Sequence, residues 1–323
     1  MSIIVTGGAG LIGSAVIWEL NNRGIEDIIV VDNLEKSEKW KNLVPLKFED
    51  YFEQDDFINL IYDNCFGDCQ GIIHLGACSS TTEKDATYLV KNNFNYSKSL
   101  AIFALRNKMK FLYASSCATY GDGSNGYIDD ENEIEKLRPL NMYGYSKQMF
   151  DLWAKRNNIL NQITGCKFSN IYGPNEYHKE NMKSVVLRAF EQISETGKMK
   201  LFKSNNPNYK DGEFKRDFLY VKDAVKMILH LFDNQFTGIF NIGSNRAETW
   251  NNLATCVFNA LNKPVNIEYI EMPENLKSKY QYYTKADTSK LIATGYSNEI
   301  MSLQDAIKDY VQNYLTKKLT LGM

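Results

Sequence analysis

The sequence predicts an α/β fold, in which a doubly wound parallel sheet is joined by a smaller, discontinuous C-terminal lobe. In the first half of the chain, short continuous apolar runs alternate with helical patterns, as in parallel sheets that are buried on both faces. From about Phe168 the pattern loosens into stretches rich in Tyr, Asn, Lys and Gly, which are typical of binding loops.

The predicted elements follow in chain order. Residues 3–5 form an apolar run that stops at a glycine, and the apolar residues of Leu11–Arg23 recur at helical spacing. Further strands are predicted at 27–32, 71–75, 110–114 and 238–243, and amphipathic helices at 249–261 and 303–315.

The length of the chain, 323 residues, suggests about two domains. We expect a nucleotide-binding domain over residues 1–168 together with about 217–242. We expect a second lobe, for the substrate, over about 169–216 and 243–323. The second lobe is therefore assembled from segments that lie apart in the sequence.

Composition excludes several classes of protein. Apolar residues make up 44% of the chain, too many for a largely disordered protein. The 37 basic and 39 acidic side chains leave no basic excess of the kind that nucleic-acid binders carry. No apolar run approaches the roughly 18 residues of a membrane span, and the N-terminus lacks the basic region of a signal peptide. We expect a cytoplasmic protein that binds neither nucleic acid nor membrane.

Six cysteines are scattered along the chain and do not form a dense disulfide framework. Cys65 and Cys69 lie close together, but no second pair of ligands accompanies them. We therefore expect no metal site and interpret the cysteines as small buried thiols.

A glycine-rich turn directly follows the first predicted strand and opens the first predicted helix. Gly7, Gly10 and Gly13 stand at three-residue spacing. Such a turn lets the backbone approach a pyrophosphate at the positive end of a helix, as in dinucleotide-binding Rossmann folds.

The end of the second strand bears on the choice of cofactor. Asp32 is placed to bond the adenosine ribose hydroxyls, which favours NAD. Lys39, in the following loop, is able to pair with the 2′-phosphate of NADP or to be a solvated loop charge. The residues alone leave this choice open.

A serine, a tyrosine and a lysine form a candidate catalytic set. Tyr143 and Lys147 are four residues apart, so a helix places them on one face. A nearby ammonium lowers a tyrosine pKa and makes the phenol a usable base near neutral pH. Ser115 and Ser116 follow the strand at 110–114, where a hydroxyl is able to bond the same substrate oxygen.

Together these residues resemble the extended short-chain dehydrogenase/reductase family, whose members act on nucleotide sugars. Within it, the chain is most similar to the ADP-L-glycero-D-manno-heptose 6-epimerases. That similarity runs from about residue 2 to 312. It is carried by segments 74–83, 113–121, 141–147, 170–174 and 214–218 and by the pair His178-Lys179.

The resemblance implies inversion at C6 of an ADP-heptose by transient oxidation and hydride return. It assigns Tyr143 and Lys179 as the two acid/base groups, Lys147 as the residue that orients the cofactor ribose, and Ser116 as the residue that holds the substrate oxygen. It further implies one tightly bound NADP, or NAD, per subunit, a homo-oligomer, and a role in lipopolysaccharide synthesis.

The remaining site residues follow from the same resemblance. On the cofactor side they are Gly7, Gly10, Leu11, Ile12, Gly13, Asp32, Asn33, Lys39, Gln54, Leu75, Gly76, Ala77, Cys78, Ser79, Asn92, Lys147, Ile171 and Lys179. On the substrate side they are Ser116, Asn170, Asn181, Arg188, Phe202, Lys203, Ser204, Asn205, Arg216 and Tyr280. A guanidinium such as that of Arg216 suits a diphosphate, because it gives bidentate charged hydrogen bonds.

The chain also departs from the family pattern. Leu75 replaces a usual glutamate and Gln54 a cofactor-side lysine, whereas Asn181 and Arg188 replace a serine and a histidine on the substrate side. The stretch 205–213 is longer than usual. Two alternatives therefore stay open: a dehydrogenase or epimerase acting on another nucleotide-heptose, such as GDP-heptose, and a cofactor-binding protein without catalysis.

Overall fold

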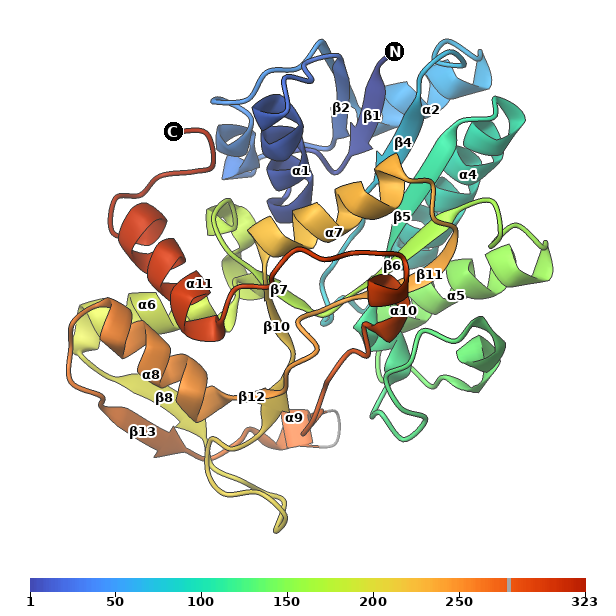
Figure 1. The fold of residues 1–323 in the computed structure, drawn as a ribbon. Coiled ribbons are helices and arrows are strands. Elements are labelled where there is room, and N and C mark those ends of the chain that lie inside the picture. The colour runs from blue at the N-terminus through green and yellow to red at the C-terminus, as the bar shows by residue number, and fades with distance from the viewer. Residues whose placement is uncertain (278–279) are drawn as a thin grey trace.

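The computed structural model describes residues 1–277 and 280–323 (Figure 1). Its centre is a seven-stranded sheet with the order β11-β6-β5-β4-β1-β2-β3, in which every pair of neighbours is parallel. The strands are β1 (Ile3–Thr6), β2 (Ile28–Asp32), β3 (Asp50–Glu53), β4 (Gly71–His74), β5 (Lys110–Ser116), β6 (Thr164–Phe168) and β11 (Gly238–Ile242).

This topology places a binding crevice between β1 and β4. From β1 the chain builds outward through β2 and β3, and it then returns to build the other half from β4. In open parallel sheets, ligands bind at this switch point, beyond the carboxyl ends of the strands. The predicted fold class and five of the predicted strands are confirmed. The short strand β3 and the strand β6 were not predicted as separate elements.

Alternate residues of β1 and β2 enter two cores on opposite faces of the sheet. Ile3 and Val5 belong to one core, and Ile4 belongs to the other. The first core includes α1 (Leu11–Asn22) and α7 (Val221–Asp233), whereas the second includes α2 (Gln54–Tyr62), α4 (Tyr96–Arg106) and α5 (Met142–Arg156). Both faces are thus covered, as the continuous apolar strands predicted.

Segments beyond residue 169 add three short two-stranded pairs. β7 (Asn170–Tyr172) pairs with β10 (Phe218–Tyr220), β9 (Lys215–Arg216) with β12 (Glu248–Thr249), and β8 (Met199–Phe202) with β13 (Ile267–Ile270). Figure 1 shows β8 and β13 beside α6 (Val185–Thr196) and α8 (Trp250–Ala260), away from the main sheet. The helices predicted at 249–261 and 303–315 are confirmed, the latter as α11 (Leu303–Asp309) followed by a π-helical stretch (Tyr310–Leu315).

The remaining helical segments are short. They are α3 (Ala86–Leu89), a π-helical stretch (Val90–Asn95), α9 (Glu274–Lys277), α10 (Ser289–Ala293) and the 3-10 helices η1 (Glu38–Asn42), η3 (Cys117–Tyr120), η4 (Glu131–Lys136) and η5 (Tyr177–Met182). In the described part of the chain, no helix is both long and apolar enough to cross a membrane. The six cysteines are free thiols. No group of three or more potential metal ligands gathers among the residues that the structure describes.

Candidate active site

The glycine-rich turn between β1 and α1 is built on close backbone approaches. Gly7 has a φ of +68°, and a Cβ added there would lie 2.6 Å from the amide nitrogen of Gly76, in the loop after β4. A Cβ on Gly13 would collide with the carbonyl oxygen of Gly7. The turn therefore needs these glycines, and it leaves open the space in front of α1 that a pyrophosphate occupies in such folds.

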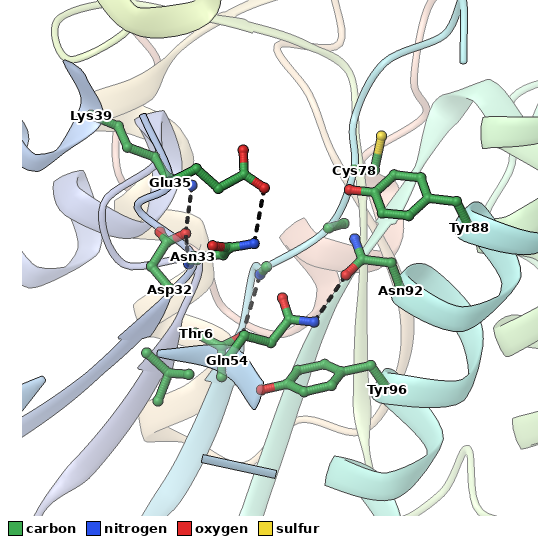
Figure 2. Close-up of a pocket in the computed structure, with 14 residues that line it drawn as sticks. Thr6, Asp32, Asn33, Glu35, Lys39, Gln54, Cys78, Tyr88, Asn92 and Tyr96 are labelled. Atoms are coloured by element: carbon green, nitrogen blue, oxygen red, sulfur yellow. Dashed lines mark hydrogen bonds and ion pairs between the residues drawn. The ribbon is translucent and has the colours of Figure 1, made fainter. Parts of the chain in front are cut away.

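The carboxylate of Asp32, at the end of β2, organises the loops beside this turn (Figure 2). It accepts hydrogen bonds from the backbone N–H groups of Ala9 at 2.8 Å and Asn33 at 2.7 Å. The ammonium of Lys39 pairs with it at 2.7 Å, and Glu35 accepts a bond from the Asn33 amide at 3.0 Å. The predicted Asp32 and Lys39 are thus brought together, and a third charge, on Glu35, joins them.

The opposite wall of this pocket comes from the start of α2 and from the continuous helical segment formed by α3, the π-helical stretch and α4. Gln54 donates to Asn92 Oδ1 at 3.0 Å, and the Tyr88 and Tyr96 rings complete the wall (Figure 2). Every residue predicted for the cofactor side lines this pocket or the adjoining groove, which shares Gly7, Asp32 and Lys39 with it. Sequence reasoning missed Tyr88, Tyr96 and Glu35, because an isolated tyrosine or loop glutamate carries no motif.

Helix α5 holds Tyr143 and Lys147 one turn apart. The Asn141 side chain caps the helix by accepting a bond from the Gly144 N–H at 2.8 Å. The Lys147 ammonium donates to the Ala114 carbonyl of β5 at 2.8 Å, and Ser116 and Tyr143 line the same two pockets. The structure thus brings the predicted serine, tyrosine and lysine together.

The pKa directions in this set differ in part from the expectation. Burial lowers the pKa of Lys147 to about 8. Burial also raises the pKa of Tyr143, and the nearby Ser116 hydroxyl opposes that rise. The predicted lowering of the Tyr143 pKa by Lys147 is therefore wrong for this structure, in which desolvation of the phenolate raises that pKa.

Lys179 enters the groove from a loop. It lies in η5, where Glu180 has a φ of +40° and breaks the helical path. Burial lowers the pKa of Lys179, and the negative charge of Glu176 opposes that effect. The groove that Lys179 lines also holds Tyr143 and Lys147. Two groups able to carry a proton therefore face one groove from different elements.

A second pocket opens from the same point. It shares Ser116, Tyr143, Phe168 and Ser169 with the groove and continues to the predicted substrate residues Asn170, Arg216 and Tyr280. Ser116 and Tyr143 thus stand at the junction of the two spaces. A substrate in the second pocket and a cofactor in the groove would meet there.

The Arg216 guanidinium lies between aromatic rings near the far end of the second pocket. It is 5.1 Å from the centre of the Tyr280 ring and 5.8 Å from that of the Trp250 ring. Its neighbour Asp217 is turned elsewhere, accepting bonds from the N–H and hydroxyl of Ser244 at 2.7 and 2.8 Å. Arg216 is therefore positioned to receive an anionic group.

Other predicted substrate residues lie outside this pocket. Phe202 packs edge-on against Tyr280, while Asn205 accepts a bond from Tyr282 at 3.1 Å. The Ser204 hydroxyl donates to the Asn206 carbonyl within the same loop. Lys203 forms an exposed ion pair with Glu271, and Arg188 is exposed on α6. The side chain of Asn181 lies outside what the structure describes.

Comparisons with known proteins agree with this geometry. Residues 3–243 match the model of the NAD dependent epimerase/dehydratase family. A relative named ADP-L-glycero-D-manno-heptose-6-epimerase, from Nitratidesulfovibrio vulgaris, is 50% identical over 314 residues, which are 97% of this chain and 97% of the relative. A relative of the same name from Fusobacterium nucleatum is 46% identical over 98% of each chain.

Solved structures have the same fold. The crystal structure of the Helicobacter pylori ADP-L-glycero-D-manno-heptose-6-epimerase superposes with a TM-score of 0.82 at 26% identity, covering 97% of this chain and 95% of that one. The UDP-N-acetylglucosamine 4-epimerase of Methanobrevibacter ruminantium superposes with a TM-score of 0.83 at 21% identity, covering 98% of each chain. The second likeness concerns the fold alone.

Proposed function

The chain belongs to the NAD dependent epimerase/dehydratase family, and on that basis we propose that it converts ADP-D-glycero-D-manno-heptose into ADP-L-glycero-D-manno-heptose. The observation that carries the proposal is identity of 44% to 50% over nearly the whole chain with relatives named ADP-L-glycero-D-manno-heptose-6-epimerase. The arrangement of the site supports it, because Ser116 and Tyr143 stand where a cofactor groove meets a second pocket.

The residues present suit a nicotinamide cofactor. The glycine turn leaves space that a Cβ would fill, and the predicted cofactor residues line one groove. C6 of the heptose bears no acidic hydrogen, so inversion by direct proton removal is disfavoured. When bound, the nicotinamide supplies a hydride acceptor that returns the same hydride, which leaves no net redox change.

The chain's own residues handle the proton of the C6 hydroxyl. Tyr143 removes it while Ser116 holds the oxygen, and Lys147 orients the cofactor ribose. After the ketone presents its other face, the oxygen lies elsewhere and a second group must serve it. Lys179 fills this role, because burial lowers its pKa toward the range of a usable base.

The nucleotide-sugar occupies the second pocket. Arg216 receives the diphosphate, with Asn170 and Tyr280 beside it, and the loop from Phe202 to Asn205 borders the nucleotide. We also propose that the nucleotide-sugar is bound by Asn181, Arg188 and Lys203. Residues 1–168 and about 217–242 bind the cofactor, and the remaining segments bind the sugar. By the family resemblance, the enzyme works as a cytoplasmic homo-oligomer and supplies heptose for lipopolysaccharide.

The cofactor proposed is NADP. Lys39 is the only lysine or arginine among the described residues that line the pocket around Asp32, and its ammonium reaches the rim there. Lys39→Gln should weaken NADP⁺ binding by about ten-fold or more and NAD⁺ binding much less, since only NADP⁺ carries the 2′-phosphate. Lys36→Gln, an exposed lysine in the same loop, is the matched control. Equal losses for the two nucleotides would show that Lys39 does not recognise the 2′-phosphate and would contradict the proposal of NADP.

The function itself is tested by incubating the purified protein with ADP-D-glycero-β-D-manno-heptose. The configuration at C6 is read by NMR while absorbance of reduced nicotinamide is followed. Inversion without lasting accumulation of reduced cofactor is expected. Accumulation of reduced cofactor, or turnover of a GDP-heptose alone, would instead indicate a dehydrogenase or an epimerase with another substrate.

A further inference from the structure

A buried carboxylate lies beneath the candidate catalytic set. Asp151 of α5 is 0% exposed. It accepts hydrogen bonds from the Tyr113 hydroxyl at 2.9 Å and the Ser115 hydroxyl at 2.8 Å, both on β5. It also pairs with the Lys167 ammonium of β6 at 2.7 Å. A charge this deep is retained only with well-placed partners, so the network is a built feature of the core.

Lys167 is held from its other side as well. Its side chain is 1% exposed, and its ammonium donates to the Thr119 hydroxyl of η3 at 2.7 Å. The same ammonium lies 5.3 Å from the centre of the Tyr120 ring. Lys167 therefore ties Asp151 to the turn that directly follows Ser116.

Lys147 precedes Asp151 by one helical turn, so the two side chains share a face of α5. The bond to the Ala114 carbonyl anchors the Lys147 ammonium, and in the described part of the chain no carboxylate pairs with it within 4.0 Å. Two buried ammonium groups thus flank one buried carboxylate, and the ion pair is made with Lys167.

We propose that Lys167 is a positioning residue of the cofactor site: by holding Asp151 in an ion pair, it keeps that carboxylate from pairing with Lys147 and leaves the Lys147 ammonium facing the cofactor groove. Without Lys167, Asp151 would be a buried charge in need of a partner. Of the two lysines that lie one turn away on α5, Lys147 is buried, whereas Lys155 is partly exposed and faces Glu135. Pairing would draw the Lys147 charge away from the groove.

The surroundings of the two groups set the direction of the effect. Cys78, in the loop after β4, acts on Lys147, and Lys147 in turn acts on His74 of β4. Tyr113, Ser115 and Lys167 surround Asp151, and Thr119 holds Lys167. Burial lowers the pKa of Lys147 to about 8, and Asp151 opposes this. Strengthening the contact with Asp151 must therefore raise the Lys147 pKa, and removing Asp151 must lower it.

Cofactor binding reports that pKa without any use of the sugar substrate. A charged Lys147 favours the anionic nucleotide, so NADP⁺ affinity should fall as pH rises through the Lys147 pKa of about 8. Lys147→Met should abolish this fall, which identifies the titrating group. Because the readout is nucleotide binding, it stays informative if the proposed epimerase activity fails.

The two partners of one ion pair should respond in opposite directions. In Lys167→Met, the fall in affinity should move to higher pH by about one unit, and in Asp151→Asn to lower pH. Lys167→Arg should keep the wild-type midpoint. Arg156→Met, which replaces an exposed side chain at the end of the same helix, is the surface control.

The double variant Asp151→Asn with Lys167→Met removes both charges, and it decides the question even if Lys167→Met does not fold. Its midpoint should lie below that of the wild type, because no carboxylate remains to raise the Lys147 pKa. A purely structural pair predicts weaker binding in all variants with an unmoved midpoint. That result, or a double-variant midpoint moved to higher pH, would overturn the proposal.

Discussion

The two groups that we propose as proton carriers are supported in contrasting ways. Tyr143 projects from α5, and the strands β5 and β6 beneath it are bound through one buried carboxylate, Asp151. Lys179 projects from a loop, which is bound through another buried carboxylate, Glu176. Tyr143 thus lies on a helix that packs against the main sheet, whereas Lys179 lies on a loop whose contacts come from residues distant in the sequence.

The partners of the two carboxylates differ in chemistry and in origin. Asp151 pairs with a cation, whereas Glu176 accepts bonds from neutral donors: Gly173 N–H, the N–H and hydroxyl of Ser184, and the Tyr310 hydroxyl. Tyr310 is 134 residues away from Glu176 in the chain. The comparison indicates that the strands of the main sheet position Tyr143 on α5, whereas the position of Lys179 depends on contacts with the C-terminal segment.

Removal of the Tyr143 hydroxyl should have the largest effect on catalysis. Tyr143→Phe should lower kcat by about a thousand-fold, since a positioned general base supplies roughly 10² to 10⁴. Tyr145→Phe, an exposed tyrosine on the same helix, should leave kcat near the wild-type value. The rate of C6 inversion measures both, and near-normal turnover in Tyr143→Phe would refute its role as base.

Lys179→Met tests the loop side and should lower the overall rate of inversion by about a hundred-fold. Oxidation of one epimer should persist in a single turnover, because Tyr143 still serves one face. Lys183→Met is the control, because Lys183 lies farther along the same loop and pairs with Glu191 of α6. Equal loss of oxidation from both epimers would show that Lys179 is not a base for one face alone.

Glu176→Gln should destabilise the protein by about 1–3 kcal/mol, because an amide cannot accept all the bonds that the carboxylate accepts. Tyr310→Phe removes one of these bonds and should cost about 1 kcal/mol. Urea unfolding measures both changes. If the C-terminal segment supports Lys179, kcat should also fall in Tyr310→Phe, although Tyr310 lies outside both pockets; an unchanged kcat would argue against that coupling.

The smallest expected effect is a difference between His74 and His178 in how each makes the stability of the protein depend on pH. Burial lowers the pKa of His74, beside β5, to about 3, and that of His178, beside Lys179, to about 4. Both pKa values lie below the ordinary 6.5, so the unfolded chain binds the extra protons and stability falls as pH drops below about 6.5.

Each histidine contributes a slope of up to about 1.4 kcal/mol per pH unit. The His74 contribution continues to lower pH, toward 3, than that of His178. His74→Gln should therefore flatten the acid side of the stability curve more than His178→Gln. Unfolding free energies measured between about pH 3 and 7 test the order, because the two contributions diverge below about pH 4.

Much of the site was predictable from the sequence, because local rules govern it. The glycine turn follows from the spacing of three glycines after a strand, and the Tyr143–Lys147 pair from the helical period. The positions of Asp32 and Lys39 follow from the strand that precedes them.

Contacts between segments that are distant in the sequence could not be predicted by such local rules. The bonds from Lys167 to Asp151 and from Tyr310 to Glu176 join separate elements, and no spacing in the chain reveals them. The rise in the Tyr143 pKa could not be predicted from the sequence for a similar reason, because desolvation depends on everything that packs around the phenol.

The most direct test of the account uses ADP-D-glycero-β-D-manno-heptose carrying deuterium at C6. If hydride leaves C6 and returns to it within one site, the product should be the L-glycero epimer with its deuterium retained. Loss of the deuterium to water during inversion would contradict transient oxidation with hydride return, and the absence of any inversion would contradict the proposed function itself.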